Sequence, residues 1–332
     1  MRLIPLLAVA LAALAHAAPP CTTTACTEWI PFGRTGARSL VYRSHPLDAP
    51  NPAITRALIV IHGQGRNADD YFRTGVAAAF LAAALDNTVV IAPRFASHDG
   101  RGCQDKLDKD EANWRCSGDS WRSGAPAINF ERLNSYDFTD EILRKLARKD
   151  IFPNLKTVVV TGHSAGGQYV SRYVMASPVH ETLPGLDIRY VISNPSSYAY
   201  LDPTRPSASN AAEFRPYVDG RNCTTYDQWP YGLKNRSTGA AAKLSEDDLR
   251  KHITARPVTF LLSELDTLPL AGFDSSCPAM AQGPSRLARG QAYAAYLKEK
   301  YNAPHPVAVV PLCGHNARCV YTSDPALAIL FP

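Results

Sequence analysis

The segment Gly162-His163-Ser164-Ala165-Gly166 places a serine between two glycines and carries the clearest chemical signal in the chain. An apolar run at 157–161 precedes it, and a helix-compatible stretch at 166–176 follows it. A sharp turn between a buried strand and a helix strains the serine backbone, lifts its hydroxyl above the sheet, and tolerates only glycine beside it. We therefore expect Ser164 to be a nucleophile that attacks carbonyl carbon.

A serine hydroxyl needs a histidine to take its proton and a carboxylate to orient that histidine. His315 follows the last predicted strand, in a loop, and is the predicted base. Asp266 follows the preceding strand and is the predicted acid, with Glu264 as the neighbouring alternative. Asp202 follows the strand predicted at 189–193 and would be the acid in a variant arrangement, in which the acid comes after that earlier strand. Serine, acid and base then occur in the chain order expected for a nucleophile on such a turn.

Glycines also follow the earlier apolar run at 57–61, in His62-Gly63-Gln64-Gly65. A loop of this kind approaches a substrate closely, so its backbone N–H groups can bind the negative oxygen of a tetrahedral intermediate. We predict that the N–H groups of Gln64 and Ala165 form this oxyanion hole. The glycine spacing does not match a nucleotide-binding loop, and we expect no nucleotide cofactor and no metal.

Six short apolar runs, separated by amphipathic stretches, must position these side chains. Runs without polar alternation are typical of strands buried on both faces, and their alternation with helices predicts a mostly parallel sheet and an α/β fold. The predicted strands are 57–61, 88–92, 157–161, 189–193, 258–263 and 307–311. The predicted helices are 74–86, 135–149, 166–176, 245–253 and 285–301.

The N-terminus has the features of a secretory signal peptide. Arg2 gives a positive start, an apolar run follows at 3–14, and Ala15-His16-Ala17 fits the small-x-small cleavage rule. We expect residues 1–17 to be the signal peptide and 18–332 to form one domain, with insertions near 96–129 and 202–242. The apolar run is too short to span a membrane, so the predicted location is secreted or periplasmic.

All eight cysteines follow the predicted cleavage site, and an even number in an oxidising compartment indicates disulfides. Short separations favour three pairs and leave a fourth by elimination. Zinc spacing is absent from the sequence, which argues against a metal site. The expected pairs are Cys21 with Cys26, Cys103 with Cys116, Cys313 with Cys319, and Cys223 with Cys277.

Composition excludes several classes of protein. The chain has 332 residues, 45% of them hydrophobic, which is enough for a large core. Its formal charge is only +5, from 35 Lys and Arg against 30 Asp and Glu, and the charges are scattered. We therefore expect no nucleic-acid partner. Charge and composition do not set the oligomeric state.

The two insertions are rich in arginines and aromatic residues. Arginines in loops near the predicted strand ends could form a basic rim, and the aromatic residues could line a substrate wall or anchor the loops to the domain. The arginines are Arg66, Arg94, Arg101, Arg115 and Arg122. The aromatic residues are Trp114, Trp121, Trp229 and Tyr231.

Together, the glycine-flanked Ser164, the His62-Gly63-Gln64-Gly65 loop, Asp266 and His315 make the chain resemble the α/β-hydrolases. With its predicted export, its predicted disulfides and its Ser-Ala-Gly-Gly sequence, the chain resembles secreted esterases of the polyhydroxyalkanoate depolymerase and feruloyl esterase type. This resemblance implies that Ser164 forms an acyl-enzyme, His315 moves the proton, and Asp266 holds the imidazole.

Three functions stay open at this point. The first is a secreted serine esterase acting on a polymeric or small-molecule ester. The second uses the same residues on amide bonds, as a peptidase or as a hydrolase of an anionic polyamide such as poly(aspartic acid), and a cationic cleft would favour it. The third is a binding protein on the same fold, which predicts that one of the three catalytic candidates is missing.

Overall fold

The computed structural model describes residues 19–332, apart from residues 101, 117–120, 208–212, 218, 220 and 271. The predicted signal peptide at 1–17 lies outside the described residues. No described helix is both long and apolar enough to cross a bilayer.

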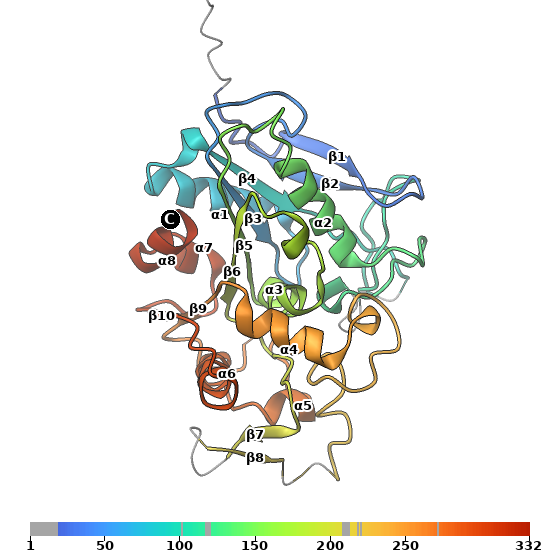
Figure 1. Ribbon diagram of the computed structural model, residues 1–332, viewed down its shortest axis with the longest axis vertical. Coiled ribbons are helices and arrows are strands. Elements are labelled where there is room, and N and C mark those ends of the chain that lie inside the picture. Colours follow the sequence, from blue (N-terminus) through green and yellow to red (C-terminus); the bar gives the residue numbers. More distant parts are fainter. Residues whose placement is uncertain are drawn as a thin grey trace, which may run out of the picture.

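A sheet of eight strands runs through the described part of the chain, in the order β1-β2-β4-β3-β5-β6-β9-β10 (Figure 1). From β4 to β10 all neighbours are parallel, whereas β2 pairs antiparallel with both β1 and β4. This confirms the predicted α/β fold with a mostly parallel sheet. The strands are β1 (Thr27–Pro31), β2 (Arg38–Arg43), β3 (Arg56–Ile61), β4 (Thr88–Pro93), β5 (Thr157–His163), β6 (Asp187–Ser193), β9 (Val258–Ser263) and β10 (Val307–Val310).

The central strands are buried on both faces, which explains their continuous apolar sequences. In β3, Ile59 and Ile61 pack into one core while Leu58 and Val60 pack into another, because successive side chains of a strand point to opposite faces. The parallel register aligns the carboxyl ends of the strands. Ile61 of β3 lies beside Gly162 of β5, and the loops after β3, β5, β6, β9 and β10 therefore start along one edge of the sheet.

Helices cover both faces of the sheet (Figure 1). Residues of α2, α3, α4 and α6 belong to the larger core, whereas α1, α7 and α8 pack on the opposite face. Four of the five predicted helices lie within four residues of their predicted bounds. The helices are α1 (Ala68–Leu81), α2 (Ser135–Leu146), α3 (Ala165–Ala176), α4 (Glu246–Ala255), α5 (Cys277–Met280), α6 (Arg286–Tyr301), α7 (Ala317–Tyr321) and α8 (Asp324–Leu330).

The helix predicted at 74–86 is displaced, because α1 covers Ala68–Leu81. Asp69 and Asp70 lie in its first turn, where acidic side chains interact favourably with the positive end of the helix. At the other end, Ala83 adopts a left-handed φ of 51°, and its N–H donates to the carbonyl of Phe80. The alanines at 82–84 favour a helix, but this left-handed turn stops it.

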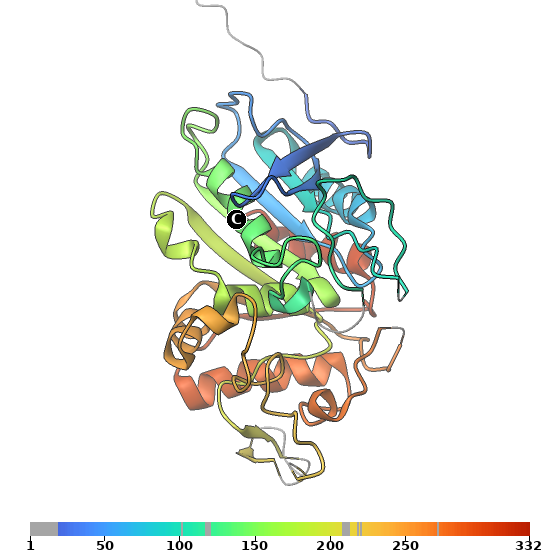
Figure 2. The ribbon, with the colours of Figure 1, turned by 90° about the vertical axis from the view of Figure 1, so that its right-hand side faces the viewer.

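The sequence did not predict β1 and β2, nor the short pair β7 (Thr204–Pro206) and β8 (Phe214–Pro216). Arg38 and Arg43 begin and end β2, which is only partly buried, so this strand lacks the continuous apolar run used to find the others. β7 and β8 form a small separate sheet inside the second insertion. This sheet lies beyond α6, at the end of the molecule away from β1 (Figure 2).

The cysteines form the four predicted pairs, three of them favoured by short separations and the fourth left by elimination. Cys103–Cys116 closes a loop within the first insertion, and Cys223–Cys277 ties the second insertion to α5. The described cysteines include none that is free. Each predicted insertion is therefore tied down by a disulfide.

A buried carboxyl group on α2 makes the stability of the fold depend on pH. Asp140 is 2% exposed, and its Oδ1 accepts hydrogen bonds from Tyr173 (2.6 Å) and Ser177 (2.7 Å). Burial raises the pKa of Asp140 to about 6, and these hydrogen bonds only partly oppose the shift. The folded protein therefore holds a proton that the unfolded chain releases at lower pH.

We predict that Asp140→Asn flattens the dependence of stability on pH. In the wild type, the unfolded chain ionises this carboxyl near pH 4 and the folded protein only near pH 6, so stability is lost as pH rises through this window. The loss is about 3 kcal/mol for a shift of about two pKa units. Urea unfolding between pH 4 and 7, with the disulfides intact, measures it. If the free energy of unfolding changed with pH in the same way for the wild type and the variant, the prediction would be contradicted.

Candidate active site

Ser164 occupies a strained turn between β5 and α3. Its φ of 60° and ψ of −119° lie outside the regions that residues with a β-carbon normally adopt. A β-carbon on Gly162 would come within 2.3 Å of the Gly166 carbonyl oxygen, and one on Gly166 within 2.3 Å of the Ile61 carbonyl oxygen. Glycine is therefore required at both positions, as the sequence predicted, and the turn presents the hydroxyl of Ser164 at the edge of the sheet.

Three side chains from distant parts of the chain meet at this edge. His315 Nε2 lies 2.9 Å from Ser164 Oγ, and His315 Nδ1 lies 2.7 Å from Asp266 Oδ2. An ionised carboxylate only accepts hydrogen bonds, so Nδ1 carries the proton in the neutral ring, and Nε2 is left to accept from the serine hydroxyl. This geometry suits proton removal from Ser164.

Asp266 is held from both sides. Besides His315 on Oδ2, Arg286 Nη1 lies 3.4 Å from Oδ1, and both the aspartate and arginine side chains are fully buried. Burial lowers the pKa of Arg286, while the charge of Asp266 opposes that shift. Ser196 accepts from Arg286 Nε (2.7 Å), and the Leu287 N–H donates to the Asp266 carbonyl (3.2 Å). The start of α6 thus fixes the carboxylate that faces His315.

The two alternative acids have other partners. Glu264 Oε2 accepts the N–H of Leu312 at 2.9 Å, which links the loops that follow β9 and β10. Asp202, at the start of the second insertion, accepts from Thr204 and from Tyr301, the last residue of α6. Of the three acids considered from the sequence, Asp266 is the one brought to His315.

The loop that carries His315 is closed by the Cys313–Cys319 disulfide. The Cys313 carbonyl accepts the N–H of Leu265 (2.9 Å), next to the acid, and the Asn316 side chain accepts the N–H of Cys319 (3.0 Å) at the start of α7. These bonds connect the loop both to the segment that follows β9 and to α7. They reduce the freedom of a histidine whose position must be accurate.

His163, the residue before the serine, packs under His315. The ring centroids are 4.5 Å apart, and His163 is 2% exposed. Burial lowers the pKa of His163 well below its usual range, and the charge of Arg286, like a proton taken up by His315, acts in the same direction. A neutral His163 therefore supports the ring of His315 without becoming a second cation.

The predicted oxyanion loop folds as a tight turn in which Arg66 N–H donates to the Gly63 carbonyl (3.1 Å). The buried His62 holds the same carbonyl, with Nδ1 at 2.8 Å, while its Nε2 accepts the N–H of Phe95 (3.1 Å). Burial lowers the pKa of His62 to about 4, so this neutral tautomer persists at neutral pH. This role of His62 was not predicted from the sequence.

These contacts determine where the predicted oxyanion donors point. The Gln64 N–H belongs to the same peptide unit as the Gly63 carbonyl, and in a trans peptide the two point in opposite directions. Ala165 is the first residue of α3, so its N–H has no acceptor within the helix. Neither N–H group donates to an acceptor among the described residues, which is a condition for an oxyanion hole.

A cleft of about 990 Å³ opens over Ser164 and His315. Polar and charged side chains form much of its wall. Among the lining residues are Gln64, Asn67, Asp70, Arg73, Asn316 and Arg318. The described residues contain no cluster of three or more His, Cys, Asp and Glu that could hold a metal ion.

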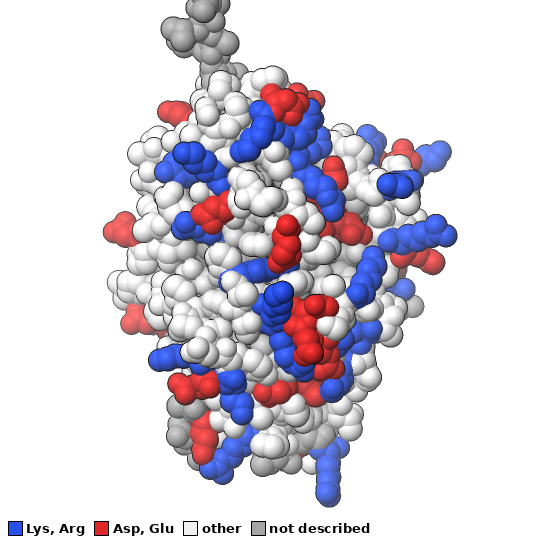
Figure 3. Space-filling view, in the orientation of Figure 1, with Lys and Arg blue, Asp and Glu red and all other residues white. Residues whose placement is uncertain are grey.

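Three of the five arginines proposed for a basic rim bind other residues of the protein, and Arg115 is exposed. Arg66 binds Asp105 (3.0 Å), Arg94 lies 3.6 Å from Glu111, and Arg122 donates to the side chain of Gln168 (3.0 Å). Arg101 lies outside the described residues. On the face drawn in Figure 3, positive and negative side chains are interspersed. The cleft itself is lined by Arg73 and Arg318 and also by Asp70, which pairs with Arg73, so its wall carries charges of both signs.

The tryptophans of the first insertion anchor it to the domain. Trp114 and Trp121 are 0% and 3% exposed, and Trp121 stacks on Phe95 at a centroid distance of 5.2 Å. In the second insertion, Trp229 Nε1 donates to the Ser123 carbonyl (3.1 Å). The anchoring role proposed for these aromatic residues therefore fits better than a substrate wall.

Comparisons with known proteins agree with this architecture. The sequence model described as "Alpha/beta hydrolase family" matches residues 58–329. Poly(aspartic acid) hydrolase-1 from Sphingomonas sp. KT-1 is 22% identical, with 92% of this chain and 98% of that chain covered and a TM-score of 0.63. A poly(3-hydroxybutyrate) depolymerase from Bordetella parapertussis is 21% identical, with 90% and 89% covered and a TM-score of 0.60. The search of curated proteins found no match.

Proposed function

The chain belongs to the alpha/beta hydrolase family, and we propose that it is a secreted serine hydrolase that cleaves carboxylic ester bonds. In this proposal Ser164 is the nucleophile, His315 the base, and Asp266 the acid. The observation that carries the proposal is the pair of hydrogen bonds from one imidazole, to Ser164 on one nitrogen and to Asp266 on the other. The four disulfides support an oxidising compartment.

The reaction would proceed in two halves. Ser164 Oγ attacks the ester carbonyl carbon while His315 Nε2 takes the hydroxyl proton, and Asp266 stabilises the resulting imidazolium. The N–H groups of Gln64 and Ala165 bind the oxyanion. His315 then gives its proton to the alcohol that leaves, which produces an acyl-enzyme. A water molecule, deprotonated by His315, releases the acid and restores Ser164.

The choice between ester and amide substrates depends on the cleft. Hydrolysis of an anionic polyamide such as poly(aspartic acid) would use the same three residues, and a cationic cleft would favour it. Arg66, Arg94 and Arg122 have partners inside the protein instead. The relatives named above act on one polyamide and one polyester, and at 21–22% identity they support the fold alone. We therefore place esters first.

The proposed activity is tested with p-nitrophenyl esters from acetate to palmitate, using protein secreted through an oxidising route. We expect measurable kcat/KM with one chain-length optimum, because a cleft of limited depth binds one acyl length best. A polyester film and poly(aspartic acid) are assayed in parallel. Hydrolysis of poly(aspartic acid) without any ester hydrolysis would overturn the ester proposal. A folded protein that is inactive on all of these substrates would overturn the proposal that it is a hydrolase.

A further inference from the structure

The turn after β3 holds a residue in an unfavourable conformation close to Ser164. Arg66 has a φ of 55°, in the left-handed region that is unfavourable for a residue with a β-carbon. In this conformation its N–H reaches the Gly63 carbonyl, the oxygen of the peptide unit that carries the Gln64 N–H. The direction of that N–H therefore depends on keeping Arg66 in this conformation.

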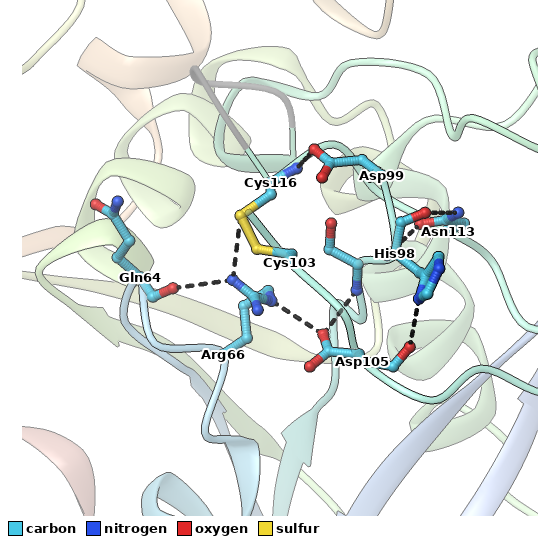
Figure 4. Close-up of a disulfide and its surroundings, with 9 residues drawn as sticks. Gln64, Arg66, His98, Asp99, Cys103, Asp105, Asn113 and Cys116 are labelled. Carbon is cyan, nitrogen blue, oxygen red and sulfur yellow. Dashed lines mark hydrogen bonds and ion pairs between the residues drawn. A yellow bond between two sulfur atoms is a disulfide. The ribbon is translucent and has the colours of Figure 1, made fainter. Parts of the chain in front are cut away.

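The Arg66 side chain is held by the first insertion (Figure 4). Its Nε donates to Asp105 Oδ2 (3.0 Å), and its Nη1 lies 3.5 Å from the Gln64 carbonyl oxygen and 3.7 Å from Cys116 Sγ. Only 15% of the Arg66 side chain is exposed. One guanidinium thus connects the turn to both ends of the loop that Cys103–Cys116 closes.

Asp105 is itself fixed within that loop. Its Oδ2 also accepts the Ser97 N–H (2.8 Å), and its own N–H donates to the Ser97 carbonyl (2.9 Å). Burial acts to raise the pKa of Asp105, but the hydrogen bonds from Arg66 and Ser97 and the charge of Arg66 outweigh it and leave the pKa lowered. The aspartate is therefore an anion at neutral pH. The Cys116 N–H donates to Asp99 (2.7 Å), which secures the far side of the disulfide.

We propose that this disulfide-closed loop positions the oxyanion hole, with Arg66 and Asp105 as positioning residues. This inference rests on the proposed function. The Arg66–Asp105 ion pair maintains the left-handed turn, the turn directs the Gln64 N–H, and Cys103–Cys116 keeps Asp105 in place. Because the oxyanion forms only after attack, a loosened turn weakens binding of the transition state more than binding of the substrate.

The ion pair is tested with Arg66→Gln and Asp105→Ala, and Asp108→Ala is the matched control. Asp108 lies in the same insertion and pairs with Arg38 on β2 at 3.2 Å, away from the turn. For the first two variants we expect kcat/KM on an ester to fall roughly tenfold to a hundredfold, with KM changed less than about twofold. Inhibition by an alkylboronic acid, which forms a tetrahedral adduct on serine, should weaken by the same factor.

The disulfide is tested with Cys103→Ala/Cys116→Ala against Cys21→Ala/Cys26→Ala, which removes a cross-link near the N-terminus. We expect the first pair to reproduce the Asp105→Ala losses and the second to keep wild-type kcat/KM and boronic acid affinity. Thermal unfolding identifies any variant that fails to fold. An active wild type whose folded Arg66→Gln variant keeps full kcat/KM and boronic acid affinity would overturn the positioning role alone. A wild type without hydrolase activity or boronic acid inhibition would overturn the proposed function as well.

Discussion

Ser164→Ala is expected to lower kcat on the best ester by roughly 10⁴-fold or more and to leave the fold intact. The variant removes the oxygen that would form the acyl-enzyme. The Ser164 side chain makes no capping hydrogen bond to α3, and the change deletes no buried packing group, so the thermal midpoint should shift by less than about 3 °C. Initial rates and thermal unfolding on the same preparations measure both quantities.

A matched serine on α3 provides the control for this substitution. Ser171 is fully buried, and its hydroxyl has no hydrogen-bond partner among the described residues. Ser171→Ala should therefore retain wild-type kcat, and removal of an unsatisfied hydroxyl should not destabilise the protein. If Ser164→Ala kept more than about a tenth of the wild-type kcat, attack by this serine would be excluded as the main route.

Asp266→Asn is expected to lower kcat by roughly 10³-fold to 10⁴-fold. The buried Arg286 next to Oδ1 would hold the amide oxygen of the asparagine, and the amide NH₂ would then face His315 Nδ1. Nδ1 would have to accept a hydrogen bond, so the ring proton would move to Nε2, opposite Ser164. A protonated Nε2 cannot take the serine proton. Steady-state kinetics on the ester series measure the loss.

The alternative acid gives the comparison for Asp266→Asn. Glu264→Gln should reduce kcat less than about tenfold, because Glu264 accepts the Leu312 N–H and a glutamine oxygen can still accept it. NMR of the imidazole N–H groups would report the tautomer of His315 directly. Loss of activity in Glu264→Gln with full activity in Asp266→Asn would reverse the assignment of the acid.

Most of the sheet could be predicted from local sequence because its central strands are buried on both faces. Val158, Val159 and Val160, for example, form a continuous apolar run with no competing pattern. β2 escaped prediction because it is half-buried and begins and ends with arginines. The start of α1 was missed because its first turn, with Asp69 and Asp70, is polar, whereas the predicted start at Thr74 followed the alanine-rich part.

The candidate site was predictable only in part. Ser164, Asp266 and His315 each follow a predicted strand, and a parallel sheet brings such positions to one edge, so sequence order sufficed to bring them together. Arg286 and Arg66 carry no such signal. Arg286 reaches Asp266 only because the start of α6 packs against the loop after β9, and Arg66 reaches Asp105 only through the folded insertion. These contacts depend on tertiary structure.

Covalent labelling with a fluorophosphonate tests the central claim most directly, because this reagent reacts with serines that a neighbouring base activates. Intact mass and peptide mapping should show one adduct per chain, located on Ser164. In a folded His315→Ala variant the labelling rate should fall by at least about 10³-fold. An adduct on another residue, or no adduct on a folded wild-type protein, would contradict the assignment of Ser164 and His315 as nucleophile and base.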